Sequence, residues 1–449
     1  MSLKISWLDS TQDNITTQMH ALRQRLSPRG DVVSESGKQK TLEIFGEALT
    51  PQEVVVKICR DVQVSGLQAA LDYSRRIDGA NLSPEELRVP LETMEDAHAH
   101  AHARLLEAVR NIRENILEFQ IALLPQDATI SRPGGFLQHK YRPLKRIGIC
   151  VPGGAAAYPS TVLMTAVPAQ AAGVEEIAVV APPTPNGAYN KDMLAVCWEI
   201  GVREVYRIGG AQAVAAMAFG IQGLPRVDKI VGPGNLFVAL AKKLVYGEVD
   251  IDSIAGPSEV VVIVDETTDT RYTALDLIAQ AEHAPGASIL IGCNRQVLEN
   301  VVRSLDAELD RLERGELARQ CLESFGAIIL AKDEDEVCRL TDLIAPEHLH
   351  IATENAAVLE AKIRNAGAVF MGNYTPVAVG DYAAGPSHVL PTSGTARFAH
   401  GLCATDFLRS HSVLHFDQEG LRRLADDIAT VATKEGLTAH RESVLERVQ

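Results

Sequence analysis

From residue 146 to about residue 371, short apolar runs rich in β-branched residues alternate with stretches of helical spacing. Apolar runs of this length, bounded by glycine and proline, are typical of strands buried on both faces. Strands that alternate with helices form βαβ units, and these units build parallel sheets. The pattern therefore predicts an α/β protein. The expected strands form two sets, at residues 147–151, 177–181, 205–208 and 229–231 and at residues 260–264, 288–292, 327–331 and 368–371.

Both ends of the chain have a different texture, and 449 residues are too many for one compact core. The N-terminal stretch shows helical spacing and no convincing strand. The C-terminal stretch also reads as mostly helical, and its charged amphipathic end would be marginal unless it packs on something. We therefore expect four regions: a helical N-terminal region at 1–140, α/β domains at 141–255 and 256–391, and a helical tail at 392–449.

Charge and composition exclude several classes of protein. A formal net charge of −15 argues against a nucleic-acid partner, because phosphate binding needs a basic surface. We expect no membrane span, since no apolar run approaches the roughly 20 residues that one requires. The start of the chain lacks the apolar core of a signal peptide. The seven cysteines form no Cys-x-x-Cys pair and read as reduced thiols, so we expect a cytoplasmic protein.

Glycines follow several of the expected strands, where a nucleotide would bind in a parallel α/β sheet. No Walker A signature occurs, and residues 232–237 approach the dinucleotide fingerprint but lack its last glycine. Taken alone, these loops are more simply explained as tight turns. A cofactor would have to bind in a non-standard way, for instance through Gln212 and Asn235 at helix starts.

Four polar side chains could together hold a metal ion. Gln280 and His283 are three residues apart, so on a helix they would project from one face. Asp381 is expected in a loop, and His440 lies on the C-terminal segment. Nitrogen and oxygen ligands without thiolates suit Zn²⁺ or Mn²⁺ in an open catalytic site. Each of the four, taken alone, is also compatible with a purely structural role.

A further imidazole cluster, His98, His100 and His102, lies in a stretch expected to form one long polar helix from residue 94 to residue 121. Residues two apart on a helix face different ways, so only His98 and His102 could share a ligand. A solvated helix face is the simpler interpretation.

Glu347 and His348 are adjacent and follow Pro346, where we expect a helix to end. Neighbouring residues do not share a face, so the two would approach a substrate from different angles, which suits two proton transfers. A His–carboxylate pair at the surface is the plainer alternative. Ser258 lies in a turn before an expected strand and could donate a hydrogen bond. The nucleophile-elbow pattern does not occur there, which argues against a serine hydrolase.

These segments, in this order, closely resemble the histidinol dehydrogenase family, which oxidises histidinol in the last two steps of histidine biosynthesis with NAD. The resemblance covers nearly the whole chain from about Pro143. The segments that carry it are residues 151–154, 160–164, 209–213, 227–235, 251–252, 255–259, 280–283, 346–349, 380–382, 388–392 and 437–440.

The resemblance implies a role for each candidate residue. The implied zinc ligands, one ion per subunit, are Gln280, His283, Asp381 and His440, and the implied acid/base pair is Glu347 with His348. Implied NAD contacts are Gln212 and Asn235. Implied contacts to L-histidinol come from Ser258, Tyr382 and Glu435, together with Gln280, His283, His348, Asp381 and His440.

The resemblance also implies a fold and an assembly. The expected fold has two incomplete Rossmann-like domains with helical N-terminal and C-terminal extensions. Its expected homodimer is intertwined, so that the tail carries His440 into the partner's site. Two positions depart from the family pattern: Cys150 stands where a Tyr near the NAD is frequent, and Ser387 stands where Asn is usual.

Three other functions remain open on the sequence. A related zinc/NAD alcohol dehydrogenase would act on another small polar alcohol, such as a sulfonated diol. A carboxylate at Glu435 disfavours an anionic substrate of that kind. A zinc hydrolase would use Glu347 as general base and need no NAD. A catalytically silent scaffold would keep the fold alone.

Overall fold

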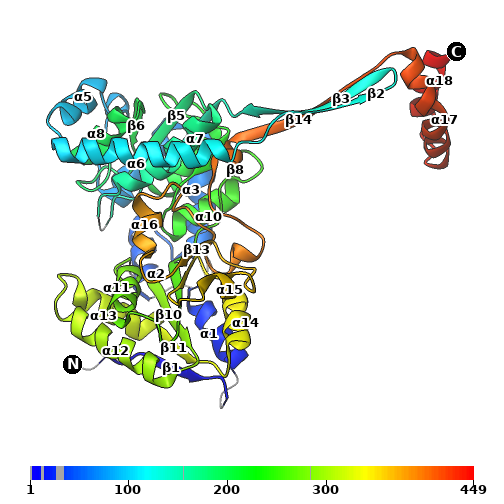
Figure 1. The fold of residues 1–449 in the computed structure, drawn as a ribbon. Coiled ribbons are helices and arrows are strands. Elements are labelled where there is room, and N and C mark those ends of the chain that lie inside the picture. The colour runs from blue at the N-terminus through cyan, green and yellow to red at the C-terminus, as the bar shows by residue number, and fades with distance from the viewer. Residues whose placement is uncertain (1–2, 12–14, 27–34, 155, 284) are drawn as a thin grey trace.

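The computed structural model describes residues 3–11, 15–26, 35–154, 156–283 and 285–449. Two parallel sheets, each covered by helices on both faces, form the body of the molecule (Figure 1). A long antiparallel ribbon leaves this body and carries the last two helices at its far end. The α/β class predicted from alternating strands and helices is confirmed.

The first sheet has five parallel strands in the order β6-β5-β4-β7-β8. Its first strand along the chain is central, the next two lie on one side and the last two on the other. The register pairs Ile147 with Ile177 and Val179 with Val205. Four of the strands were predicted. The strands are β4 (Arg146–Cys150), β5 (Glu176–Ala181), β6 (Glu204–Arg207), β7 (Lys229–Val231) and β8 (Asp250–Ile251).

Helices cover both faces of this sheet because its strands carry apolar side chains on both faces. Ile147, Ile149 and Val179 pack in a core with one group of helices. Val180 and Ile230 pack in the core on the other face. The first group is α5 (Leu91–Ala99), α6 (Ala103–Ala122), α7 (Pro159–Ala172) and α8 (Lys191–Glu199). The second group is α3 (Pro51–Ser65), α4 (Leu67–Asp78), α9 (Gly210–Phe219) and α10 (Leu236–Val245), with α2 (Glu35–Phe45) beside them.

The second sheet has six parallel strands in the order β1-β11-β10-β9-β12-β13. Apart from β1, its strand order is that of the first sheet: the first strand of the unit is central, and the later strands add on either side. Val260 and Val262 face one core, while Val261 and Ile263 face the other. The strands are β1 (Ser6–Asp9), β9 (Ser258–Val264), β10 (Gly286–Gly292), β11 (Ala327–Leu330), β12 (His348–Ile351) and β13 (Ala368–Met371).

Two further groups of helices cover the six-stranded sheet. One face is covered by α11 (Thr270–Ala281), α12 (Arg295–Leu309) and α13 (Gly315–Phe325). The other is covered by α1 (Ile15–Leu26), α14 (Glu334–Ile344) and α15 (Ala356–Glu360). The short helix α16 (Val377–Tyr382) follows β13. In the described part of the chain, no helix combines the length and the apolar content that crossing a bilayer requires.

The projecting ribbon consists of β2 (Ala128–Arg132), β3 (Gly135–Pro143) and β14 (Leu408–Phe416). Gly134, at φ +76°, turns the chain between β2 and β3. Helices α17 (Gln418–Lys434) and α18 (Thr438–Val448) pack on each other at the tip, remote from the sheets (Figure 1). We call this ribbon with its two helices the arm.

The sequence predictions about the ends missed several strands. Residues 1–140 were expected to be helical, yet β1 joins the six-stranded sheet, and β2 and β3 belong to the arm. The tail at 392–449 is mostly helical as expected, but it also contains β14. The ribbon shows little apolar alternation because much of it faces solvent: every residue of β2 is exposed.

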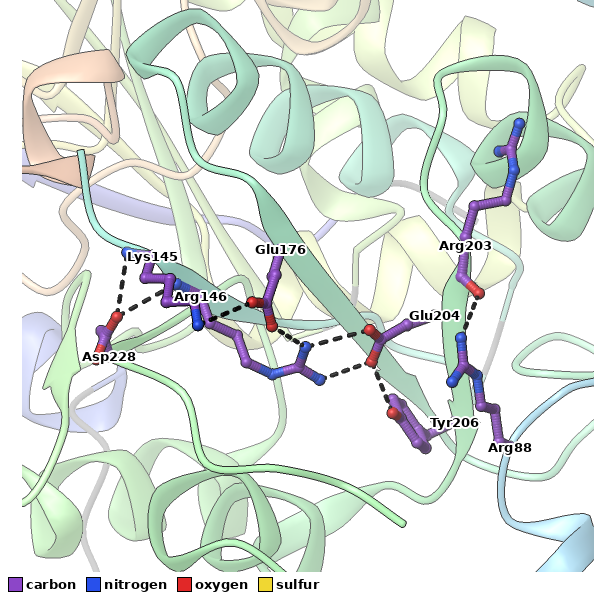
Figure 2. Close-up of polar contacts among 8 residues, drawn as sticks. All are labelled: Arg88, Lys145, Arg146, Glu176, Arg203, Glu204, Tyr206 and Asp228. Carbon is purple, nitrogen blue, oxygen red and sulfur yellow. Dashed lines mark hydrogen bonds and ion pairs between the residues drawn. The ribbon is translucent and has the colours of Figure 1, made fainter.

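Charged side chains close the edge of the five-stranded sheet where its strands begin. The guanidinium of Arg146 donates to Glu176 at 2.9 Å and to Glu204 at 2.6 Å, and Tyr206 donates to Glu204 at 2.7 Å (Figure 2). Asp228 accepts hydrogen bonds from the backbone N–H groups of residues 145 and 146. This network ties three neighbouring strands together and leaves the opposite edge of the sheet as the place for a ligand.

Candidate active site

A cavity of about 570 Å³ opens at the carboxyl edge of the five-stranded sheet. Its walls are the glycine-containing loops after β4, β6 and β7, together with parts of α2 and α3. Ligands of parallel α/β sheets bind at this edge. Cys150 lies in the wall, and burial raises the pKa of its thiol to about 12, so at neutral pH it is an uncharged wall group.

Both predicted NAD contacts, Gln212 and Asn235, line this cavity. Gln212 is buried in α9 and donates from Nε2 to Oδ2 of Asp78 at 3.1 Å. Asn235 precedes α10, and its Oδ1 accepts hydrogen bonds from the backbone N–H groups of Phe237 and Val238. The polar side chains of the cavity are therefore held in place by partners inside the chain.

A buried ion pair fixes the loop after β7. Lys242 contacts Asp252, and both side chains are almost fully buried. Lys242 also donates to the carbonyl of Gly232 at 3.0 Å, and Asp252 accepts from the N–H of Gly232 at 2.7 Å. Gly232 has φ +100°, and a Cβ there would collide with the carbonyl oxygen of Cys150. Glycine is required at this position because the backbone passes so close to β4.

The predicted acid/base pair lies at the amino edge of the six-stranded sheet. We expected Glu347 and His348 at the end of a helix, but α14 already ends at Ile344, and His348 begins β12. Ala345, buried and at φ 49°, turns the chain between helix and strand. Both members of the pair are about 5 % exposed, so the alternative of a surface pair was wrong.

The pair is held by the first residues of the central strand β9. The backbone N–H of Glu259 donates to Glu347 Oε2 at 2.9 Å, and His348 Nδ1 lies 3.3 Å from the carbonyl oxygen of Glu259. His348 Nδ1 is also 3.6 Å from Glu347 Oε2. Ser258, half-buried at the start of β9, forms a side-chain hydrogen bond with Glu347.

Burial and charge shift the pKa values of this pair. Burial raises the pKa of Glu347 because the ionised carboxylate is poorly solvated. Burial opposes a charge on His348, but the carboxylates of Glu347 and Asp381 outweigh it and raise its pKa to about 9. Neighbouring groups with perturbed pKa values are typical of proton-transfer sites.

Asp381 joins this pair from α16, and not from a loop as we expected. Its Oδ1 is 3.5 Å from His348 Nε2. Both residues line a cavity of about 610 Å³. Burial disfavours the ionised form of Asp381, but the hydrogen bond and charge of His348 lower its pKa.

His388 is a site residue to which we assigned no role from the sequence. It lines the same cavity, its Nδ1 is 3.1 Å from the carbonyl oxygen of Asp381, and it interacts electrostatically with His283 and His348. Burial lowers the pKa of His388 and favours the neutral imidazole. Its place in the resembling segment 388–392 was the available signal.

Gln280 and His283 do not lie within one helix as expected, because α11 ends at Ala281, but the backbone N–H of His283 still donates to the Gln280 carbonyl at 3.3 Å. Gln280 occupies the last turn and is buried, whereas His283 lies in the following turn and is exposed. A Cβ at Gly286 would lie 2.6 Å from the Gln280 carbonyl oxygen, so glycine lets this turn pack against β10. The Nε2 of Gln280 is buried and has no hydrogen-bond partner within the described ranges.

The remaining predicted residues lie in two places. Tyr382 ends α16, is largely exposed, and interacts electrostatically with Tyr158, which lines the first cavity. The two cavities are thus near one another. Glu435, which follows α17, and His440, on α18, are exposed residues of the arm. The single chain does not bring them to Gln280 and Asp381, because the arm points away from the body (Figure 1).

Local contacts account for His98, His100 and His102. The expected long helix is two helices, α5 and α6, with His102 capping α6 by accepting from the N–H of Arg104. His98 lies 2.6 Å from Glu199, and His100 contacts Asp96. The three imidazoles therefore do not converge on one ion.

Comparison with known proteins places the chain in one family. The family profile described as Histidinol dehydrogenase matches residues 47–448. Over 442 residues the chain is 59% identical to a histidinol dehydrogenase of Rhodopirellula baltica, covering 98% of this chain and 96% of the relative. It is 41% identical to the Aquifex aeolicus enzyme of that name over 416 residues, covering 92% and 93% of the two chains.

A solved structure gives the same answer for the fold. The crystal structure of histidinol dehydrogenase from Elizabethkingia anophelis superposes with a TM-score of 0.88 at 30% identity, covering 100% of this chain and 99% of the other. The sequence comparison and the fold comparison therefore point to the same family along the whole chain, including the segment that carries the buried Glu347–His348 pair. The chain belongs to the histidinol dehydrogenase family.

Proposed function

We propose that this protein oxidises L-histidinol through L-histidinaldehyde to L-histidine, reducing two NAD⁺. The observation that carries the assignment of roles is the buried Glu347–His348 pair, whose imidazole lies 3.6 Å from one carboxylate and 3.5 Å from the Asp381 carboxylate. A two-step oxidation needs a base for the alcohol proton and a base for water, and two adjacent groups supply both.

In this assignment, His348 accepts the alcohol proton in the first step in its neutral form, which a bound cation beside Asp381 would favour by offsetting the charge that raises the pKa of His348. Glu347 deprotonates the water that adds to the aldehyde before the second oxidation. Burial raises the pKa of Glu347 and so makes the carboxylate a stronger base. Hydrogen bonds from Glu259 and Ser258 orient the Glu347 carboxylate.

The donor set supports one zinc site per subunit. Gln280, His283 and Asp381 would hold the ion, with His440 as a further ligand. The side-chain amide of Gln280 is buried and its Nε2 has no hydrogen-bond partner in the described ranges, so this amide could ligate a metal through its oxygen and donate to a bound substrate. When bound, Zn²⁺ would hold substrate nitrogens as a Lewis acid and offset the Asp381 charge beside His348.

The first cavity is proposed as the NAD site. Its volume, its position at a carboxyl sheet edge and its glycine loops support a bound dinucleotide. The strand order of both sheets supports two Rossmann-like domains, at residues 141–255 and 256–391. Gln212 and Asn235 would contact the cofactor from the starts of α9 and α10.

An intertwined homodimer would complete the site. Glu435 and His440 line a groove of about 370 Å³ on the arm, beside the exposed apolar residues Val431 and Leu437. Exposed apolar surface of this kind marks an interface. In the dimer, the arm of one chain would bring His440 to the metal and Glu435 to the ammonium group of the substrate. The same carboxylate would repel a sulfonated diol.

The test is the stoichiometry of turnover. Metal-loaded protein should release two NADH per histidinol consumed, lose activity on chelation and regain it with Zn²⁺. If NADH were released with a sulfonated diol and not with histidinol, the diol would be the substrate. Turnover without NAD⁺ would indicate a hydrolase, and no turnover of any kind would indicate a silent scaffold.

The roles within the pair can be separated. Glu347→Gln keeps the shape of the side chain and removes its basicity. It should slow oxidation of supplied histidinaldehyde far more than oxidation of histidinol, by roughly 10²–10⁴-fold. Equal slowing of the two half-reactions would contradict the assignment of water activation to Glu347.

A further inference from the structure

The loop before the arm carries a cluster of metal-binding side chains that the proposed reaction does not use. His400, Cys403 and Asp406 offer an imidazole nitrogen, a thiol sulfur and a carboxylate oxygen within 4.8 Å of one another. Among the residues that the structure describes, this is the one group of three or more His, Cys, Asp and Glu side chains with that spacing.

The carboxylate of Asp406 lies between the other two ligand groups. His400 Nε2 is 3.7 Å from Asp406 Oδ1, and Cys403 Sγ is 3.5 Å from Asp406 Oδ2. Ligand bonds of about 2.0–2.3 Å at tetrahedral angles separate ligand atoms by roughly 3.3–3.7 Å. Each oxygen of the carboxylate is therefore at such a separation from one neighbour, and a small rotation of the carboxylate would let a single zinc-class cation contact all three side chains.

Hydrogen bonds orient the ligand atoms. His400 Nδ1 is 2.9 Å from the carbonyl oxygen of Gly401, so the N–H sits on Nδ1 and the lone pair of Nε2 faces Asp406. The backbone N–H of Cys403 donates to Asp406 Oδ2 at 2.8 Å and fixes the carboxylate. Thr405 Oγ1 lies 2.9 Å from the Cys403 sulfur.

The backbone that carries the cluster is anchored to the body. Leu402 donates to the carbonyl of Val389 at 2.8 Å, and Ala404 donates to the side chain of Gln120 at 2.8 Å. Ala404 and Phe407 are fully buried. Ligands held on a fixed loop lose little freedom when a metal binds. His400 remains exposed, which leaves the ion a path of entry.

We propose that His400, Cys403 and Asp406 form a thiolate-containing divalent-cation site of the Zn²⁺ class, distinct from the proposed catalytic one. It would leave a fourth coordination position for water. The site lies at the rim of the cavity that also contains His348 and Asp381, because His400 and Cys403 line the same cavity. Binding displaces the Cys403 thiol proton, so affinity rises with pH.

Cobalt substitution tests this site separately from the catalytic one, whose proposed ligands include no sulfur. Apo full-length protein, reduced and free of oxygen, is titrated with Co²⁺ and followed in the near ultraviolet. A sulfur-to-cobalt charge-transfer band should appear, be lost in Cys403→Ser and weaken in affinity at least about tenfold in His400→Asn. Cys293→Ser, which removes an exposed cysteine elsewhere, is the matched control and should keep the band.

Alkylation gives a second readout. Zn²⁺ should protect Cys403, and not Cys293, from a thiol reagent, as read by mass spectrometry. The proposal is overturned if the wild type gives no charge-transfer band, if the band survives Cys403→Ser, or if Cys293→Ser removes it. Histidinol oxidation tests only the proposed function, so the two can fail independently.

Discussion

The two parallel sheets share a strand order, but their candidate sites lie at opposite edges. The five-stranded sheet is closed by the Arg146 network where its strands begin and has the 570 Å³ cavity where they end. The six-stranded sheet carries Ser258, Glu347 and His348 where its strands begin. At its carboxyl edge the cavity is only about 80 Å³.

Strand order alone therefore does not decide at which edge of a sheet a cavity forms. At the carboxyl edge of the six-stranded sheet, Asp265 accepts from the side chain of Thr267, and Asn294 donates to Glu266. These turns fill the position that glycines leave open in the first sheet. Side chains at the strand ends make the difference, and four substitutions can sharpen or break the comparison.

The largest effect is expected at the amino edge of the six-stranded sheet. His348→Asn removes the proposed base and should lower kcat for histidinol oxidation by roughly 10²–10⁴-fold. His100→Asn, an exposed histidine paired only with Asp96, should leave kcat unchanged. If the kcat of His348→Asn stayed within a factor of a few of the wild-type value, the amino edge of this sheet would not carry the reaction.

At the carboxyl edge of the five-stranded sheet, Lys242→Met leaves the Asp252 charge buried without its cation. Breaking such a pair should lower the free energy of unfolding by about 3–5 kcal/mol. Urea denaturation measures it, with the exposed neighbour Lys243→Met as the control. If the two variants lost similar stability, the buried pair would not be what holds the Gly232 loop.

Gly232→Ala tests the close approach of this loop to β4. Strain at φ +100° and collision with the Cys150 carbonyl should together lower the free energy of unfolding by about 2–4 kcal/mol. The variant should also bind NAD more weakly. Gly247→Ala is the matched control, since Gly247 has φ +108° and open space around it. This control should lower the free energy of unfolding by about 1 kcal/mol. Equal losses would mean that backbone strain alone matters.

The Arg146 network gives a smaller and pH-dependent effect. Burial opposes ionisation of Glu204, but its hydrogen bond to Arg146 outweighs this and lowers the pKa of the carboxyl. A lowered folded-state pKa stabilises the fold above the unfolded value of about 4.3, and the stabilisation is lost as the pH falls through the folded value.

Arg146→Met should therefore cost about 2 kcal/mol at pH 7, less than a fully buried pair because Glu176 and Glu204 are partly exposed. The deficit should shrink as the pH falls below about 4.3. Denaturation of wild type and variant across this range measures it. A deficit that stays constant with pH would mean that packing, and not charge, is lost.

The sequence predicted the strands that are buried on both faces, such as β4, β9 and β10, because continuous apolar runs leave few alternatives. It did not reveal β2, β3 or β14, where Ile130 and Leu414 face solvent and the polar pattern resembles a loop. It also missed β1, a four-residue edge strand. Pairing of these strands depends on partners far away in the chain.

For the site, the sequence identified Glu347, His348 and Asp381 but not their local structure. Whether a helix stops at Ala281 or Ile344 depends on how the next strand packs, which short-range spacing does not encode. His388 reaches the site through one contact to the Asp381 carbonyl, a tertiary relation invisible in the sequence. The direction in which the arm projects also depends on contacts in the folded chain, and local sequence patterns do not encode it.

Mixing two inactive variants tests most directly whether the amino edge of the six-stranded sheet is completed by the arm of a second chain. His348→Asn and His440→Asn are each purified, unfolded together and refolded as a mixture. If each site uses His440 of the partner subunit, every hybrid dimer has one intact site, and the mixture should regain about a quarter of wild-type activity. If the mixture stays as inactive as its components while hybrid dimers are present, the site is not shared between chains.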